Sequence, residues 1–379
     1  MSAATAVAAP LRVLQVIETG GPGGAETVFA DLSAGLRERG HTVQCLVAPG
    51  SWLPDTLRER GLSVEPLVSG GAFDVALLRS LIALIRRERI ELVHAHLFEG
   101  ALYAAMAARL ARIPSVATLH GQVDVARGGW RSAIKRRIFG ASIGAVVTVS
   151  DALRRDLAPV LPLPAHRLLV VPNGVAMRPW SSRSPRTAAQ RTARLIAVGN
   201  IRAPKNYPLL LEAVALLRQS VPTVHLDVLG EPDPGGLFAA LQTQVEALGL
   251  HGAVTFHGFV ADPTPLLMQA DAFVLASSQE GFSLATIEAM QAGVPVVATR
   301  SGGPEEILRH GETGLLVPVN DAAALADAIG QVLRDTALAE RLTAAARDDA
   351  VRRFSLDSMV SAYEQLYRRL LQPPALAYG

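Results

Sequence analysis

Short apolar runs rich in β-branched residues alternate with amphipathic segments along the first half of the chain. The runs occupy residues 11–18, 41–48, 91–97, 114–120, 144–150 and 167–175. Nearly continuous apolar strands separated by amphipathic helices are typical of a parallel sheet that is covered on both faces. The pattern therefore predicts an α/β domain with a Rossmann-like sheet.

The same alternation restarts in the second half, with strand-like runs at residues 194–201, 224–230, 253–259, 272–277, 294–299 and 313–319. A stretch rich in proline, serine and arginine separates the halves, and 379 residues exceed one ordinary core. We therefore predict two Rossmann-like α/β/α domains, at 1–176 and 194–355, joined by a linker at 177–193. A final helix and tail, at 356–379, should cross back to the first domain.

Ligands bind beyond the carboxyl ends of the strands in open α/β sheets. Two such domains facing each other would therefore place a site in the cleft between them.

The charge, the cysteine content and the apolar runs of the chain exclude several classes of protein. The formal net charge is only +2 and the basic residues are scattered, so nucleic acid is not expected as a partner. A single cysteine, Cys45, excludes an intramolecular disulfide and favours a reducing compartment. The N-terminus lacks the features of a signal peptide, and no uncharged apolar run reaches about 18 residues. We expect a cytoplasmic protein with at most peripheral contact with the inner face of the membrane.

A glycine-rich turn follows the first apolar run, with Gly20, Gly21, Gly23 and Gly24 ahead of an amphipathic helix. Glycine lets a ligand approach the backbone, and a helix N-terminus offers free N–H donors. The spacing nearly matches a dinucleotide fingerprint, but Glu26 stands where glycine or alanine is needed for helix packing. We therefore disfavour a dehydrogenase and interpret the turn as a phosphate or sugar contact, with a simple tight turn as the alternative.

Three histidines lie near the ends of strands in the first half. His120, followed by Gly121, ends one strand, where a histidine can hydrogen-bond a substrate. His94 and His96 share one face of the preceding strand, a spacing that could ligate a metal, but no third ligand is evident. We prefer ordinary hydrogen bonding for this pair.

Two loops of the second half carry charge where strands end. Asn200, Arg202 and Lys205 precede a helix. Two cations beside a helix N-terminus can neutralise a diphosphate, and a solvated polar turn is the alternative. Glu231 and Asp233 lie among prolines, and we interpret them as part of a turn rather than as a metal site.

The segment SSQEGFSLATIEAM carries Glu280 and Glu288 across the predicted start of a helix, where free N–H groups favour some other anion. A second glycine turn, SGGPEEI, places Glu305 and Glu306 at another helix start. Acidic residues there are often only partners of the helix dipole.

The chain resembles glycosyltransferase family 4 over nearly its whole length. The resemblance lies in six motifs that occur in the order of the family: GGPGGAE, TLHG, VPNGV, the loop of Arg202 and Lys205, EGFSLATIEAM and SGGPEEI. The resemblance implies a GT-B fold and a hexosyltransferase that uses a nucleotide-sugar, with a UDP-sugar favoured, and retains the anomeric configuration. It also implies that the C-terminal half binds the donor. The N-terminal half would select a saccharide or lipid-linked acceptor, in cell-surface polysaccharide or glycolipid biosynthesis.

The resemblance assigns roles by position. Arg202 and Lys205 would hold the leaving diphosphate, and Glu288 would bind the ribose. The implied catalytic residues are His120, Arg202, Lys205 and Glu280; the donor-binding residues are Gly23, Gly24, Asn200, Glu231, Gly281, Phe282, Ser283, Leu284 and Glu288; the acceptor-side residues are Gly21 and Gly121. One departure is Asn200, which stands where the family usually has arginine.

No metal or other cofactor is expected, because two cations and helix N-termini can stabilise charge on the leaving diphosphate. No residue can be assigned as a covalent nucleophile, and same-face attack with the leaving phosphate as base is the usual proposal for the family. The alternatives are another GT-B enzyme, such as a nucleotide-sugar epimerase, and a non-catalytic nucleotide-sugar binding protein. Donor hydrolysis would distinguish binding from catalysis.

The segment of residues 128–144 mixes Trp130 and Ile134 with Arg136 and Arg137 in an amphipathic pattern. Such a helix can lie on anionic lipid, and a core helix with a solvated side fits the pattern as well. Membrane contact would favour a lipid-linked acceptor.

Overall fold

The computed structural model describes residues 9–50, 52–68, 74–121, 125, 129–177 and 192–372. The chain divides into two compact units. The first contains the residues up to Pro172 together with those from Leu356 onward, and the second is Asn173–Ser355. Of the predicted linker, residues 178–191 lie outside the described part of the chain.

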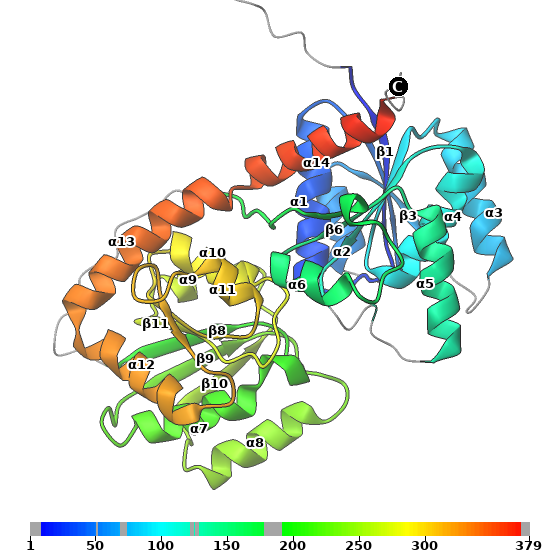
Figure 1. Ribbon diagram of the computed structural model, residues 1–379. Coiled ribbons are helices and arrows are strands. Elements are labelled where there is room, and N and C mark those ends of the chain that lie inside the picture. The colour runs from blue at the N-terminus through cyan, green and yellow to red at the C-terminus, as the bar shows by residue number, and fades with distance from the viewer. Residues whose placement is uncertain are drawn as a thin grey trace, which may run out of the picture. The chain divides into compact units, whose positions relative to one another are not determined.

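Over its described residues, the first unit contains a seven-stranded parallel sheet (Figure 1). The strands are β1 (Arg12–Ile17), β2 (Thr42–Val47), β3 (Ser63–Pro66), β4 (Leu92–His96), β5 (Ser115–Leu119), β6 (Ala145–Thr148) and β7 (Leu168–Val170), in the spatial order β3-β2-β1-β4-β5-β6-β7. The apolar runs predicted six of these strands. They missed β3, because this edge strand is only four residues long and none of its side chains is fully buried.

Helices connect the strands of the first unit. They are α1 (Gly24–Glu38), α2 (Trp52–Glu59), α3 (Val75–Arg87), α4 (Phe98–Ala111), α5 (Trp130–Ser142), α6 (Asp151–Leu157), the 3₁₀ turn η2 (Ala165–Arg167) and α14 (Leu356–Leu371). The last of these comes from the far end of the sequence and packs along α1 (Figure 1). The predicted return of the C-terminal helix to the first domain is thereby observed.

The second unit repeats the architecture with a six-stranded parallel sheet over the residues that the structure covers. Its strands are β8 (Arg194–Val198), β9 (His225–Leu229), β10 (Val254–Gly258), β11 (Ala272–Leu275), β12 (Val296–Thr299) and β13 (Leu315–Val317), in the order β10-β9-β8-β11-β12-β13. Its helices are η4 (Ala203–Lys205), α7 (Tyr207–Leu217), α8 (Leu237–Ala247), α9 (Thr264–Leu267), α10 (Leu284–Gln291), α11 (Gly303–Ile307), α12 (Ala322–Arg334) and α13 (Thr336–Arg353).

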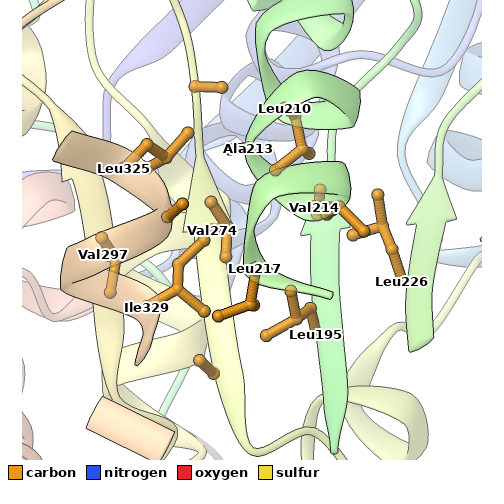
Figure 2. Close-up of a cluster of buried hydrophobic side chains, with 14 of the residues drawn as sticks. Leu195, Leu210, Ala213, Val214, Leu217, Leu226, Val274, Val297, Leu325 and Ile329 are labelled. Atoms are coloured by element: carbon orange, nitrogen blue, oxygen red, sulfur yellow. The ribbon is translucent and has the colours of Figure 1, made fainter. Parts of the chain in front are cut away.

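The core of the second unit lies between its sheet and the helices α7 and α12 (Figure 2). Leu195 and Val274 of the sheet pack with Val214 of α7 and with Leu325 and Ile329 of α12, and all five side chains are inaccessible to solvent. Burying a side chain of this size contributes about 1.5–3 kcal/mol. This packing holds rigid the strands from which the site loops emerge.

The strand order reverses beside β1 in the first unit and beside β8 in the second, since later strands are added on the other side of each. Such switch points are where the loops at the carboxyl ends of neighbouring strands diverge and leave room for a ligand. Strands β8 and β11 pair directly, so the loops that follow them lie at the switch point of the second unit.

The contact between α14 and α1 depends on a glycine. A Cβ atom placed on Gly35 would lie 2.6 Å from Cγ2 of Val360, so only glycine permits this approach. Farther along α14, the hydroxyl of Ser361 and the carboxylate of Glu364 accept hydrogen bonds from Arg39, at 2.7 and 3.1 Å. Close packing and charge pairing thus hold α14 in the first unit.

Gly35→Ala should lower the free energy of unfolding by up to about 2 kcal/mol. Overpacking against the stiff Val360 costs about 1–3 kcal/mol, which exceeds the gain of about 1 kcal/mol from better helix propensity. Urea unfolding of Gly35→Ala, Val360→Ala and the double mutant forms a cycle. We expect the double mutant to be more stable than the sum of the single effects predicts; strictly additive effects would contradict the contact.

Candidate functional site

Two loops of the second unit are joined at the ends of neighbouring strands. Asn200 follows β8, and its Oδ1 accepts a hydrogen bond from the N–H of Glu231, which follows β9, at 2.9 Å. The N–H of Ile201 donates to the carbonyl of Glu231 at 2.8 Å. A Cβ on Gly230 would lie 2.0 Å from the carbonyl oxygen of Gly199, so the loops touch through glycine backbone. Asn200, which departs from the family pattern, therefore fixes the shape of this loop.

Lys205, in the loop after β8, forms an ion pair with a glutamate of another loop. It ends the turn η4, and its Nζ lies 2.6 Å from Oε2 of Glu280, which follows β11. The same carboxylate oxygen accepts a hydrogen bond from Oγ of Ser277 at 3.1 Å. The side chains of Lys205 and Glu280 are 25% and 12% exposed, so both are accessible to a ligand without being fully solvated.

Glu280 is held in place by the neighbouring loop after β12. Its N–H donates to the carbonyl of Ser301 at 2.9 Å, and its carbonyl accepts from the N–H of Gly303 at 2.8 Å. A Cβ on Gly303 would lie 2.6 Å from the carbonyl oxygen of Gly281. Glycine in the SGGPEEI turn therefore lets this loop press against the segment that carries Glu280.

Helix α10 begins beside this carboxylate. Oγ of Ser283 caps the helix by accepting from the N–H of Thr286 at 3.2 Å, and Phe282 is buried with its ring 5.7 Å from that of Phe354. In the described part of the chain, the N–H groups of Gly281, Phe282 and Ser283 have no hydrogen-bond partner. Three backbone donors and a lysine therefore lie on one side of the unit, an arrangement suited to an anion.

The other predicted residues of this unit differ in their surroundings. Arg202 is exposed, and its guanidinium donates to the neighbouring carbonyl of Ile201 at 2.9 Å. Leu284 is the first residue of α10, and Glu288 is half-buried within the helix and has a polar contact. The structure thus brings together Lys205 and Glu280 and leaves Arg202 on the surface of the same loop.

Two acidic features have local structural roles, as the sequence suggested. Asp233 accepts hydrogen bonds from the N–H groups of Gly235 and Phe238, at 2.8 and 3.0 Å, which identifies it as a turn residue. Glu305 accepts from the N–H of Gly302 at 2.8 Å, at the start of α11. Among the described residues, no group of three or more possible metal ligands occurs.

In the first unit, the glycine-rich turn leads into α1, which begins at Gly24. The carbonyl of Gly23 accepts two hydrogen bonds from Thr27, through its N–H and its hydroxyl, both at 2.9 Å. A Cβ on Gly23 would lie 2.3 Å from a carboxylate oxygen of Glu26, whereas a Cβ on Gly21 would meet open space. A side chain at position 23 would therefore displace the carboxylate of Glu26, the residue that breaks the dinucleotide pattern.

His94, His96 and His120 form a polar row in the first unit, in which His94 and His96 are fully buried and His120 is half-buried. Nδ1 of His96 lies 3.0 Å from Nε2 of His120. His94 uses both nitrogens, with Nδ1 2.6 Å from the hydroxyl of Tyr367 and Nε2 2.8 Å from that of Thr118. The prediction of hydrogen bonding rather than metal binding for His94 agrees with these contacts. Gly121, beside His120, has open space where a Cβ would lie.

Burial keeps these histidines neutral. It lowers the pKa of His94 from 6.5 to about 3 and that of His120 to about 4. Burial also raises the pKa of Tyr207, with a smaller effect from the charge of Glu280. The first unit therefore offers neutral hydrogen-bonding groups, whereas the second offers a lysine and a carboxylate.

Several contributing residues were not predicted. Ser277 was overlooked because a serine before a turn carries no distinctive signal. The partners of His94, Thr118 and Tyr367, lie 24 and 273 positions away along the chain, and no local pattern connects them. Gly199, which directly follows β8 and precedes Asn200, could have been found from its place at the end of an apolar run.

Family models match both halves of the chain. Residues 22–178 match the model described as Glycosyltransferase Family 4, and residues 180–349 match the one described as Glycosyl transferases group 1. The glycogen synthase of Mycobacterium tuberculosis is 30% identical over 293 residues, covering 74% of this chain and 69% of that protein. The chain therefore belongs to glycosyltransferase family 4 and is a glycosyltransferase.

Other relatives span nearly the whole chain. N-acetyl-alpha-D-glucosaminyl L-malate synthase of Bacillus anthracis is 28% identical, covering 92% of this chain and 95% of that protein. The crystal structure of Anabaena Alr3699/HepE in complex with UDP-glucose has a TM-score of 0.84 and 22% identity, and the match covers 95% of this chain and 100% of that one. The likeness to this structure confirms the predicted GT-B fold. The names of the relatives support activity of the hexosyltransferase type.

The buried histidines should make stability depend on pH. Below about pH 6.5 the unfolded chain binds a proton at His94 that the folded protein refuses down to about pH 3, so stability falls as the pH falls through this window. For this one group, the free energy of unfolding should change by up to about 1.4 kcal/mol per pH unit. His94→Gln should be less stable at pH 7 yet show a shallower slope. Urea unfolding at pH 7, 6 and 5 measures both, and parallel slopes would contradict a neutral His94.

Proposed function

We propose that the protein is a retaining hexosyltransferase that uses a UDP-sugar as donor and a saccharide or lipid-linked compound as acceptor. The observation that carries this proposal is the pairing of Lys205 with Glu280 beside three N–H groups at the start of α10 that have no hydrogen-bond partner among the described residues. Solved structures of Anabaena Alr3699/HepE, which share the fold, are complexes with UDP, with UDP and glucose, and with UDP-glucose. A role in cell-surface polysaccharide or glycolipid biosynthesis is part of the proposal.

Lys205 would stabilise the leaving diphosphate. Breaking the bond between sugar and phosphate builds negative charge on the diphosphate, and a preorganised cation offsets that charge most in the transition state. The only lysines of the chain are Lys135 and Lys205, in a sequence whose other cations are arginines. An ammonium on a flexible stem can leave Glu280 and follow a phosphate, whereas a guanidinium favours a fixed bidentate geometry.

Glu280 and the start of α10 would bind the other parts of the donor, namely the sugar and a phosphate. The N–H groups of Gly281, Phe282 and Ser283 suit a phosphate, which leaves the carboxylate of Glu280 to accept from sugar hydroxyls once Lys205 has moved to the diphosphate. Glu288, inside α10, would bind the ribose, while Arg202 would supplement the charge of Lys205. In the first unit His120 would hydrogen-bond the donor sugar.

The reaction we propose needs neither a metal nor a covalent nucleophile. Lys205 and helix N-termini supply positive charge to the diphosphate. Attack by the acceptor hydroxyl on the face that the diphosphate leaves would retain the configuration, and its proton would pass to the departing phosphate oxygen. Glu280 is already engaged by Lys205 and Ser277, and we give it a binding role rather than a nucleophilic one.

A peripheral membrane contact through α5 would fit a lipid-linked acceptor. Trp130 and Ile134 are 69% and 43% exposed, and with Arg131 and Arg137 they form one exposed face of α5. By contrast, Lys135 is paired with Glu99 at 2.7 Å. An exposed Trp and Ile flanked by arginines suit an anionic lipid surface. No helix among the described residues is long and apolar enough to cross a membrane.

Lys205→Ala should lower kcat by about 10²- to 10³-fold, the usual loss when one preorganised donor is removed. Glycosyl transfer and UDP release from UDP-glucose and other UDP-sugars measure it. Lys135→Ala is the matched control, because Lys135 also forms a 2.7 Å pair with a glutamate at similar exposure. A folded Lys205→Ala enzyme with near-normal turnover would remove Lys205 from the mechanism.

Donor binding can be observed at Lys205 directly. Reductive ¹³C-methylation labels only Lys135, Lys205 and the N-terminal amine and keeps the lysine charge. We expect UDP to shift the NMR signal of Lys205 and to leave that of Lys135 unchanged. A protein that binds UDP-sugars without hydrolysing or transferring them would instead be a binding protein.

The membrane contact predicts sedimentation with vesicles of phosphatidylglycerol. The double variant Arg131→Glu/Arg137→Glu should lose that sedimentation, since each basic residue near an anionic surface contributes about 1 kcal/mol. Arg347→Glu/Arg352→Glu changes charge equally in the second unit and serves as the control. Absence of vesicle binding by the unaltered protein at low salt would rule out the contact.

A further inference from the structure

The contact between His96 and His120 leaves one nitrogen of each ring unused. His96 is fully buried on β4, and His120 directly follows β5. Nδ1 of His96 faces Nε2 of His120 at 3.0 Å. Over the described residues, Nε2 of His96 is buried without a partner, and no hydrogen bond involves Nδ1 of His120.

The hydrogen-bond partners of the two rings determine which nitrogen of each ring carries the proton. Burial lowers the pKa of both rings, so each is neutral and carries one N–H near pH 7. If Nε2 of His120 were the donor, the proton of His96 would lie on its own Nε2, which has no acceptor. Buried N–H groups without an acceptor are rarer than buried acceptors without a donor. The proton of His96 therefore lies on Nδ1 and is donated to His120.

The ring of His96 is held by packing as well as by this bond. The ring of Phe29 meets it edge to face with centroids 5.2 Å apart, and the ring of His94 lies 4.5 Å away on the same strand. His94 is itself fixed at both nitrogens by Tyr367 and Thr118. His120 is only half-buried and follows its strand, so His96 is the fixed partner and His120 the oriented one.

We propose that His96 is a positioning residue that holds His120 in the tautomer protonated at Nδ1 and so provides an N–H for the donor sugar. This inference rests on the proposed function, which assigns His120 to the sugar. An N–H at that nitrogen donates to a hydroxyl oxygen, whereas the other tautomer would present only a lone pair. His96 acts through His120 and does not touch the ligand.

NMR of protein labelled with ¹⁵N-histidine tests the tautomer directly, because long-range ¹H–¹⁵N correlations differ between the two forms. His120 should show the form protonated at Nδ1. His96→Leu should abolish this preference and lower kcat by about 10- to 100-fold, the range found when a group that orients a functional histidine is removed. His96→Asn keeps an N–H donor close to the place of Nδ1 and should restore both the tautomer and most of the turnover.

Tyr367→Phe is the structural control. It removes the hydroxyl bonded to His94, so it should lower stability while leaving the His120 tautomer and turnover unchanged. A His120 protonated at Nε2, or a His96→Leu variant with unaltered spectrum and turnover, would overturn the positioning role. His120→Ala distinguishes a failure of the positioning role of His96 from a failure of the proposed contact between His120 and the sugar. If it is impaired while His96→Leu is not, only this inference fails; if it keeps full turnover, the assignment of His120 to the sugar fails as well.

Discussion

In a parallel sheet that helices cover on both faces, reactive polar side chains gather at the ends of the strands, and this constraint applies to both halves of the chain. Along the middle of each strand a polar side chain is costly unless it is hydrogen-bonded, because helices exclude water from both faces. Where the strands end, the backbone enters loops and polar groups meet. Lys205, Glu280 and His120 each follow the carboxyl end of a strand. Their positions are a consequence of the sheet.

The loops that carry these residues are made rigid by backbone contacts. Glycines 230 and 303 let loops touch where a side chain would collide with backbone. Hydrogen bonds between the loops then fix the backbone of Glu280, since both its N–H and its carbonyl are engaged by the loop after β12. A functional group held this way loses little entropy when it meets a ligand, and so contributes more to binding and catalysis.

The sequence was most informative where the physical signal is local. Runs of β-branched residues predicted twelve of the thirteen strands found among the described residues, and the missed β3 is too short and too exposed to give such a signal. Glu280 and Lys205 could be singled out because each stands beside a helix start. Their mutual contact could not, since 75 residues separate them. The partners of His94 and His96 were hidden for the same reason, because a buried hydrogen bond is a property of the packed fold.

The placement of α14 has a consequence for biosynthesis. The first unit is discontinuous in sequence, because residues 173–355, which form the second unit, stand between its last strand and its last helix, α14. Until α14 emerges from the ribosome, the hydroxyls of Tyr363 and Tyr367 are absent and Thr118 and His94 lack those partners within the nascent sheet. The second unit can complete its core during translation, whereas the first must wait for α14. The half that is synthesised first is therefore the half that is finished last.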